Sequence, residues 1–241
     1  MVLSRGYSRK MKKLLKDWKW QELLLLFISI SIIIVVFFIP KEKNVISLIV
    51  SILGVITVLM CSKGLFYAPF LDFIYIALYI ILAIKEKYYG EVIIYILIMI
   101  PLNTFTLVEW FKNRKEGTNI VTINKVSKKE WFIVSIISVI ITFIFYFILK
   151  LLNTSQLIVS TISLATSIIS AYLLLRRSSY YAIGYITNDI VLIILWSLSC
   201  INGNLSNLPL VISLSVFLIN DSYGLYNWKR QEIKQKEELI N

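Results

Sequence analysis

The segment WFIVSIISVIITFIFYFIL, residues 131–149, contains no charged residue and decides the class of this protein. Because an α-helix rises about 1.5 Å per residue, about 20 apolar residues cross the hydrocarbon core of a bilayer, which is roughly 30 Å thick. Segments of similar length and character recur at residues 20–40, 45–62, 64–84, 91–111, 156–175, 180–201 and 206–228. The sequence therefore predicts an all-α membrane protein with eight transmembrane helices.

The composition agrees with this class. Hydrophobic residues make up 58% of the 241 residues and the mean hydropathy is +0.79, whereas ordinary soluble domains contain roughly 45–50% apolar residues. The longest piece between segments, residues 112–130, is too short to bury a core of its own. We therefore expect a basic arm at residues 1–19, one membrane domain at residues 20–228 and a tail at residues 229–241, with no soluble domain.

Basic residues are distributed unevenly along this chain, which has a formal net charge of +11. If the N-terminus is cytoplasmic and every segment spans, 20 of the 25 Lys and Arg residues fall on the cytoplasmic side. This bias follows the positive-inside rule and predicts a protein of the inner (plasma) membrane with both termini in the cytoplasm. The basic arm is then an anchor facing anionic lipid and not a signal peptide, because no small-residue cleavage site follows it. The charge does not indicate nucleic-acid binding.

Several residues and motifs that enzymes and metal sites use do not occur in the sequence. There is no histidine, no G-x-x-x-x-G-K phosphate loop and no G-x-S-x-G motif. Cys61 and Cys200 are predicted on opposite membrane faces, which argues against a disulfide, and a zinc site lacks ligands. We therefore expect no enzymatic activity, cofactor or metal. Transport is the favoured class; a membrane sensor or scaffold is the alternative, disfavoured because no output domain is present.

The ends of two apolar segments resemble each other. Asn103 precedes Trp110 by seven residues, and Asn220 precedes Trp228 by eight. An offset of about 115 residues also lays segment 45–62 on 156–175 and segment 64–84 on 180–201. We therefore expect two parallel three-helix repeats, residues 45–111 and 156–228, joined by a connector helix at 131–149 and preceded by one extra helix. Chance similarity between apolar segments is the alternative.

Four isolated polar residues, Asp72, Asn103, Asp189 and Asn220, are predicted about 10–13 Å from the cytoplasmic ends of their helices. Polar groups in lipid are costly, so a shared depth favours a substrate site. Helical spacing places aromatic and hydroxyl residues on the same faces. The predicted substrate-binding residues are Asp72, Tyr75, Tyr79, Asn103, Thr106, Tyr185, Asp189, Trp196, Asn220 and Tyr223. Such a site suits a flat and preferably cationic ring; the alternative is that these groups only join helices by hydrogen bonds.

Several motifs resemble those of the PnuC family of nicotinamide riboside transporters, and the resemblance extends over residues 20–228. The most specific are Tyr88-Tyr89-Gly90-Glu91, Pro101-Leu102-Asn103 and Asn220-Asp221-Ser222-Tyr223-Gly224. The resemblance implies a fold like that of the sugar-transporting SWEET proteins. It also implies uptake of a precursor for NAD biosynthesis by facilitated diffusion, with phosphorylation by a cytoplasmic kinase as the trap, and assembly as a homotrimer.

The chain departs from the family pattern in its seventh segment. The family commonly has two tryptophans there, and the matching positions in this sequence are Ala182 and Tyr185. In the fourth segment the family's Pro-Met-Gln is Pro101-Leu102-Asn103. These changes alter the size and stacking surface of the pocket. We therefore expect a nucleoside-like vitamin precursor such as nicotinamide riboside, with thiamine, riboflavin and deoxynucleosides as alternatives.

Overall fold

The computed structural model describes residues 18–240, so most of the predicted basic arm lies outside the described residues. Eight of its helices are long and apolar enough to cross a membrane, which confirms the predicted all-α class and helix number. The elements are α2 (Trp20–Phe37), α3 (Val45–Lys63), α4 (Ala68–Lys85), the continuous run α5 (Tyr89–Ile94), η1 (Tyr95–Met99) and α6 (Ile100–Lys112), α7 (Lys128–Leu151), α8 (Leu157–Leu175), α9 (Tyr181–Ile201), the short η2 (Leu205–Asn207) and α10 (Leu208–Ile240).

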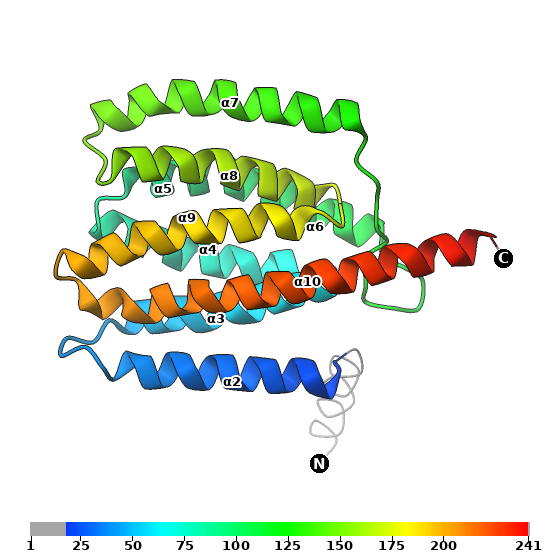
Figure 1. Cartoon of the computed structure of the whole chain (residues 1–241), viewed down its shortest axis with the longest axis horizontal. Helices are drawn as coiled ribbons and strands as arrows, with labels where there is room; N and C mark the ends of the chain where they lie inside the picture. The colour runs from blue at the N-terminus through cyan, green and yellow to red at the C-terminus, as the bar shows by residue number, and fades with distance from the viewer. Residues whose placement is uncertain (1–17, 241) are drawn as a thin grey trace, which may run out of the picture.

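The helices lie side by side in a bundle, with α7 at one edge and α2 at the other (Figure 1). α2 begins and α10 ends at the same end of the bundle, which we call the terminal end; the opposite end is the distal end. The two edge helices are the least buried, with 17% of the apolar window of each covered by other helices. Their exposed side chains, such as Phe132 and Phe143, form the surface that faces lipid.

The start of α4 and the end of α10 differ most from the predicted segments. α3 ends at Lys63, and the Gly64 that follows has a φ of +73°, the left-handed conformation that commonly follows a helix. α4 begins only at Ala68, with Pro69 in its first turn, so Asp72 lies one turn into the helix and closer to the terminal end than predicted. α10 continues about three turns past Trp228, so the predicted tail is largely helical. Ion pairs from Lys229 and Lys236 to Glu232 support this extension.

The fourth span changes its winding in the middle of the membrane. Residues Tyr95–Met99 form a π-helical turn between α5 and α6. Pro101 follows at the start of α6, where it has no N–H to donate to the preceding turn. π-Turns of this kind are frequent at functional sites. Here the turn directs Tyr95 and Met99 toward the interior of the bundle.

Candidate substrate site

Polar side chains from α3, α4, α9 and α10 meet around two small chambers in the interior, with volumes of about 60 Å³ and about 50 Å³. Both chambers are lined by Thr57, Val58, Asp72, Tyr185 and Asp221, so we treat them as one central cavity. The chamber toward the distal end adds Gly54, Tyr75, Tyr95, Met99, Asn188, Asp189, Leu192, Leu214 and Phe217. The other adds Cys61, Pro69, Asn103, Leu174 and Tyr181.

Three carboxyl groups line this cavity. Asp189 of α9 and Asp221 of α10 are 3% and 2% exposed, and both line the chamber toward the distal end. Oδ2 of Asp189 accepts no hydrogen bond from an amide, amine or alcohol in the described part of the chain. Asp72 faces the same space from α4. Because buried carboxyl groups without donors are costly, this arrangement favours a ligand that supplies positive charge or N–H groups.

The walls of the cavity are aromatic and partly fixed by hydrogen bonds. Tyr75, Tyr95 and Tyr185 present their rings to it. Oδ1 of Asn188 accepts hydrogen bonds from the hydroxyls of Thr166 (2.7 Å) and Ser167 (3.0 Å) on α8, which orients its amide. Flat rings beside oriented polar groups suit a planar, polar ligand.

Gly54 of α3 provides part of the cavity's space. A Cβ atom at this position would lie 2.4 Å from the ring of Phe217 and 2.9 Å from that of Tyr75. Glycine is therefore the residue that lets α3 approach α4 and α10 this closely.

Five of the ten predicted site residues line the cavity: Asp72, Tyr75, Asn103, Tyr185 and Asp189. Asn103 also donates from Nδ2 to the carbonyl oxygen of Pro69 (2.9 Å), so it joins α6 to α4 as well. Whether these residues bind substrate stays a prediction.

The other five predicted residues lie outside the lining. Tyr79 and Trp196 are fully buried next to the cavity on its distal side. Asn220 is buried and its amide has no partner among the described residues. The hydroxyl of Thr106 donates to Leu102 in its own helix, and that of Tyr223 donates to Glu22 (2.5 Å) at the terminal end.

The sequence reasoning missed Asp221, Asn188, Tyr95 and Met99. Asp221 could have been found, because the cost argument that selected Asp189 applies to any carboxyl in an apolar segment. Asn220 was preferred because it matches Asn103 in the expected repeat. Tyr95 and Met99 had no comparable signal, since aromatic and thioether side chains are ordinary in membrane helices.

The distal side of the cavity is closed by a polar aromatic network. Nε1 of Trp196 donates to the hydroxyl of Tyr79 (2.8 Å), and that hydroxyl donates to Glu91 (3.3 Å). Glu91 is fully buried and also accepts from Ser163 of α8 (2.7 Å). The ring of Tyr95 lies 4.6 Å from that of Tyr79, centroid to centroid.

Glu86 forms a second closure at the distal end, in the turn after α4. Its carboxylate accepts hydrogen bonds from Ser199 (2.6 Å), Asn204 (2.8 Å) and Asn207 (2.7 Å). These donors belong to the end of α9 and to the residues around η2, so one carboxylate holds the two halves of the bundle together at this end.

The terminal side is closed by rings that bond to the main chain. Trp110, Trp228 and Tyr181 are at most 1% exposed. The ring centroid of Trp228 lies 5.7 Å from that of Trp110 and 4.7 Å from that of Tyr181. Nε1 of Trp110 donates to the carbonyl oxygen of Leu174, and Nε1 of Trp228 to that of Cys61, each at 3.0 Å. Buried side chains thus lie between the cavity and both ends of the bundle.

The chain is similar to known membrane transporters. The profile of the nicotinamide mononucleotide transporter family matches residues 44–230. The nicotinamide riboside transporter PnuC of Neisseria mucosa is 24% identical over 211 residues, which is 86% of this chain and 79% of that protein. A crystal structure of the vitamin B3 transporter PnuC superposes with a TM-score of 0.79 at 23% identity, covering 90% of this chain and 94% of the other. The chain therefore belongs to the nicotinamide mononucleotide transporter family, the PnuC family of multi-pass membrane transporters.

Proposed function

We propose that this protein takes up nicotinamide riboside, or a closely similar cationic vitamin precursor, by facilitated diffusion. Intracellular phosphorylation then traps the substrate. The observation that carries the proposal is the central cavity, which is lined by Asp72, Asp189 and Asp221 and by tyrosine rings, while no basic side chain among the described residues lines it.

The family is named after nicotinamide mononucleotide, whereas its Neisseria member is named a nicotinamide riboside transporter. The charge of the cavity distinguishes between these two compounds. A mononucleotide carries a phosphate with a charge of about −2 at neutral pH, which three nearby carboxyl groups would repel. A riboside carries only its cationic pyridinium ring, which carboxylates and tyrosine faces attract. The cavity therefore favours the riboside. Thiamine is also cationic and remains the alternative; neutral riboflavin and deoxynucleosides fit the charge less well.

We infer that transport proceeds by alternating access between two parallel three-helix repeats, α3–α6 and α8–α10, as in SWEET-like folds. Two features support the repeat. Trp110 in the last helix of the first unit bonds to the end of α8, and Trp228 in the last helix of the second bonds to the end of α3. Gly64 and Arg177, with φ of +73° and +55°, end α3 and α8 in the same way. The volume of each chamber is well below the roughly 300–1,000 Å³ of typical ligand sites, so substrate entry requires the repeats to separate.

We further propose that the terminal end faces the cytoplasm, because most Lys and Arg residues lie there. The trimeric assembly and the functional link to a cytoplasmic kinase that the family resemblance implies belong to the same proposal. In this orientation, the kinase would meet the substrate as it leaves past Trp228.

Counterflow in proteoliposomes tests the proposal. Vesicles loaded with unlabelled nicotinamide riboside should take up labelled nicotinamide riboside transiently, without an ion gradient. Unlabelled thiamine, riboflavin, a deoxynucleoside and nicotinamide mononucleotide are then tested as competitors. Inhibition by cationic compounds alone supports the assignment. Accumulation that collapses with an ionophore would contradict facilitated diffusion, and strong competition by the mononucleotide would contradict the charge argument.

A further inference from the structure

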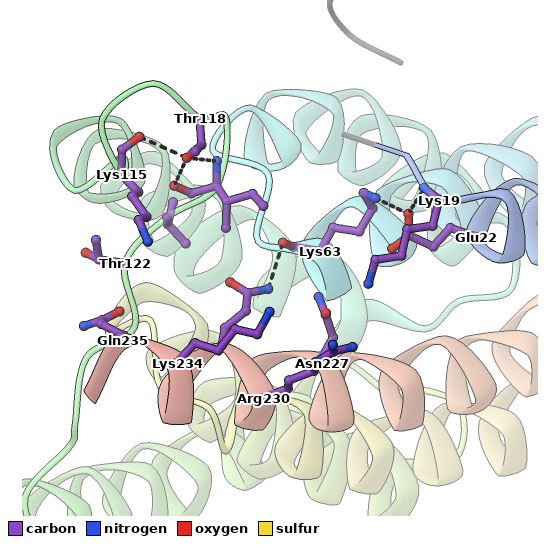
Figure 2. Close-up of a pocket in the computed structure, with 13 residues that line it drawn as sticks. Lys19, Glu22, Lys63, Lys115, Thr118, Thr122, Asn227, Arg230, Lys234 and Gln235 are labelled. Carbon is purple, nitrogen blue, oxygen red and sulfur yellow. Dashed lines mark hydrogen bonds and ion pairs between the residues drawn. The ribbon is translucent and has the colours of Figure 1, made fainter. Parts of the chain in front are cut away.

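A larger pocket lies at the terminal end, outside the central cavity. It has a volume of about 380 Å³ and opens between the start of α2, the end of α3, the loop after α6 and the extension of α10 (Figure 2). Its lining residues are Lys19, Glu22, Lys63, Lys115, Thr118, Ile120, Val121, Thr122, Asn227, Arg230, Gln231, Lys234 and Gln235. Its volume falls in the range of small-ligand sites.

The lining is strongly basic. Five of these residues are Lys or Arg, and Glu22 is the one acid among them. Glu22 is already engaged by Lys63 and by the hydroxyl of Tyr223. Among the other cations, Lys115 pairs with Glu238. Lys19, Arg230 and Lys234 form no ion pair within the described residues, so the part of the chain that the structure describes leaves a net positive charge in the pocket.

The basic residues in the extension of α10 fall into two groups, one paired with an acidic residue of the same helix and one facing the pocket. Lys229 and Lys236 both pair with Glu232, whereas Arg230 and Lys234, one turn apart, line the pocket without an acidic partner. Figure 2 shows both side chains on the pocket side of the helix, across from Lys19 and Lys115.

Neutral amides hold the frame of the pocket. Asn227 donates to the carbonyl oxygen of Ser62 (3.0 Å), Gln231 to that of Lys63 (3.4 Å) and Gln235 to that of Ile123 (3.0 Å). These bonds fix α10 against the end of α3 and the loop after α6. The side chains of Lys19, Arg230 and Lys234 are therefore the basic groups that remain available to a ligand.

We propose that this pocket binds a phosphate-bearing anion, either the headgroup of an anionic phospholipid or a soluble nucleotide. A phosphate monoester such as AMP carries about two negative charges and the phosphodiester of a phospholipid carries one, and both offer several acceptor oxygens. These match the guanidinium of Arg230 and the ammonium groups of Lys19, at the start of α2, and Lys234. The bound anion connects both helices. Because Trp228 of α10 also closes the central cavity, occupancy strengthens the terminal closure.

Binding to the full-length protein in a neutral detergent tests the proposal. The soluble probe is AMP, with adenosine as its phosphate-free control; the lipid probe is short-chain phosphatidylglycerol, with phosphatidylcholine as the zwitterionic control. Calorimetry gives Kd and a thermal scan gives Tm. We expect at least one phosphate-bearing probe to bind and to raise Tm. Binding of AMP alone assigns a soluble ligand, binding of phosphatidylglycerol alone assigns a lipid, and mutual competition shows that both use the same groups.

Charge-matched variants locate the site. Arg230→Gln combined with Lys234→Gln should weaken Kd at least tenfold. Lys229→Gln combined with Lys236→Gln removes the same charge from the same helix outside the pocket and should change Kd less than twofold. Lys19→Gln, on a different helix, should weaken Kd severalfold. The proposal is overturned if neither probe binds more tightly than its control, or if the two double variants weaken binding equally.

Discussion

The two ends of the central cavity are closed by different chemistry. At the distal end the closing contacts run between side chains and finish on the carboxylates of Glu86 and Glu91. At the terminal end the closing contacts are indole N–H groups that bond to main-chain carbonyls within a cluster of buried rings. Carboxylates that lose these donors can be solvated by water. Rings of either closure expose apolar area when they separate, but only the two indoles of the terminal closure also leave helix-end carbonyls without partners. The comparison indicates that the terminal closure costs more to open than the distal one.

Loss of the central ring of the terminal closure should give the largest effect. Trp228→Ala removes contacts with Trp110 and Tyr181 and leaves the carbonyl of Cys61 without its donor, so we expect about 3–5 kcal/mol of destabilisation. Thermal or denaturant unfolding in detergent measures it. Trp20→Ala, at a position that is 76% exposed, is the control and should change stability by less than about 0.5 kcal/mol. Equal effects of the two substitutions would refute the terminal closure.

The cavity between the two closures is tested through Asp189. A charge-assisted contact contributes roughly 1.5–3 kcal/mol, so Asp189→Asn should weaken binding of a cationic substrate about 10- to 100-fold. A neutral nucleoside should lose much less, because an amide still bonds to hydroxyl groups. Calorimetry with both ligands decides. Asn220→Ala serves as the comparison, since Asn220 is buried but is not among the residues that line the cavity. Unchanged affinity in Asp189→Asn would show that the polar residues only join helices.

The two indole bonds provide a matched pair within the terminal closure. Trp110→Phe and Trp228→Phe each keep a ring but leave one buried carbonyl without a donor, which costs about 1–3 kcal/mol. If the two repeats are equivalent, the losses should agree within about 0.5 kcal/mol. Urea titration of the two single variants and the double variant measures this. A large difference between the single variants would argue against reciprocal repeats.

The distal closure is expected to be more tolerant. Glu86→Gln keeps an acceptor but removes the charge that strengthens three hydrogen bonds, a loss of about 1 kcal/mol. Hydrogen exchange should then increase around η2 and the end of α9 and stay unchanged around Trp228. Glu42→Gln removes a charge at the same end from an exposed loop residue and should leave exchange unchanged. Faster exchange at the terminal end instead would contradict the conclusion that the terminal closure costs more to open than the distal one.

Labelling of loop residues can test which end of the bundle faces the cytoplasm, without perturbing either closure. Glu116→Cys and Glu42→Cys place a thiol on an exposed loop at the terminal and distal ends, in a chain with Cys200 replaced by Ser. An impermeant maleimide added to intact cells should label position 42 and leave position 116 unlabelled. Labelling of position 116 from outside would place the terminal end outside the cell.

Much of the fold was predictable because hydrophobic length determines spans regardless of packing. The number of transmembrane helices followed from hydrophobic length alone. Asp189 was selected because a carboxyl group is costly in the middle of an apolar segment. Asn220 and Asp221 are neighbours that point about 100° apart on the helix; the expected repeat favours Asn220, whereas the cost of a carboxyl group in an apolar segment indicates Asp221. Tyr223 was predicted together with Asn220, and neither residue is among those that line the cavity. Contacts such as that between Glu91 and Ser163 join residues far apart in sequence and have no local signature.

Gly54 has a consequence for which molecules the protein admits. Flat vitamins differ in ring width as well as in charge. The space for a ring in the cavity depends on position 54, where glycine carries only a hydrogen atom in place of a side chain. A single methyl group at this position would press Phe217 and Tyr75 into the space that a ring must enter. Under the proposed function, the aspartates would select the charge of the substrate, and glycine at position 54 would set how wide a ring the cavity accommodates.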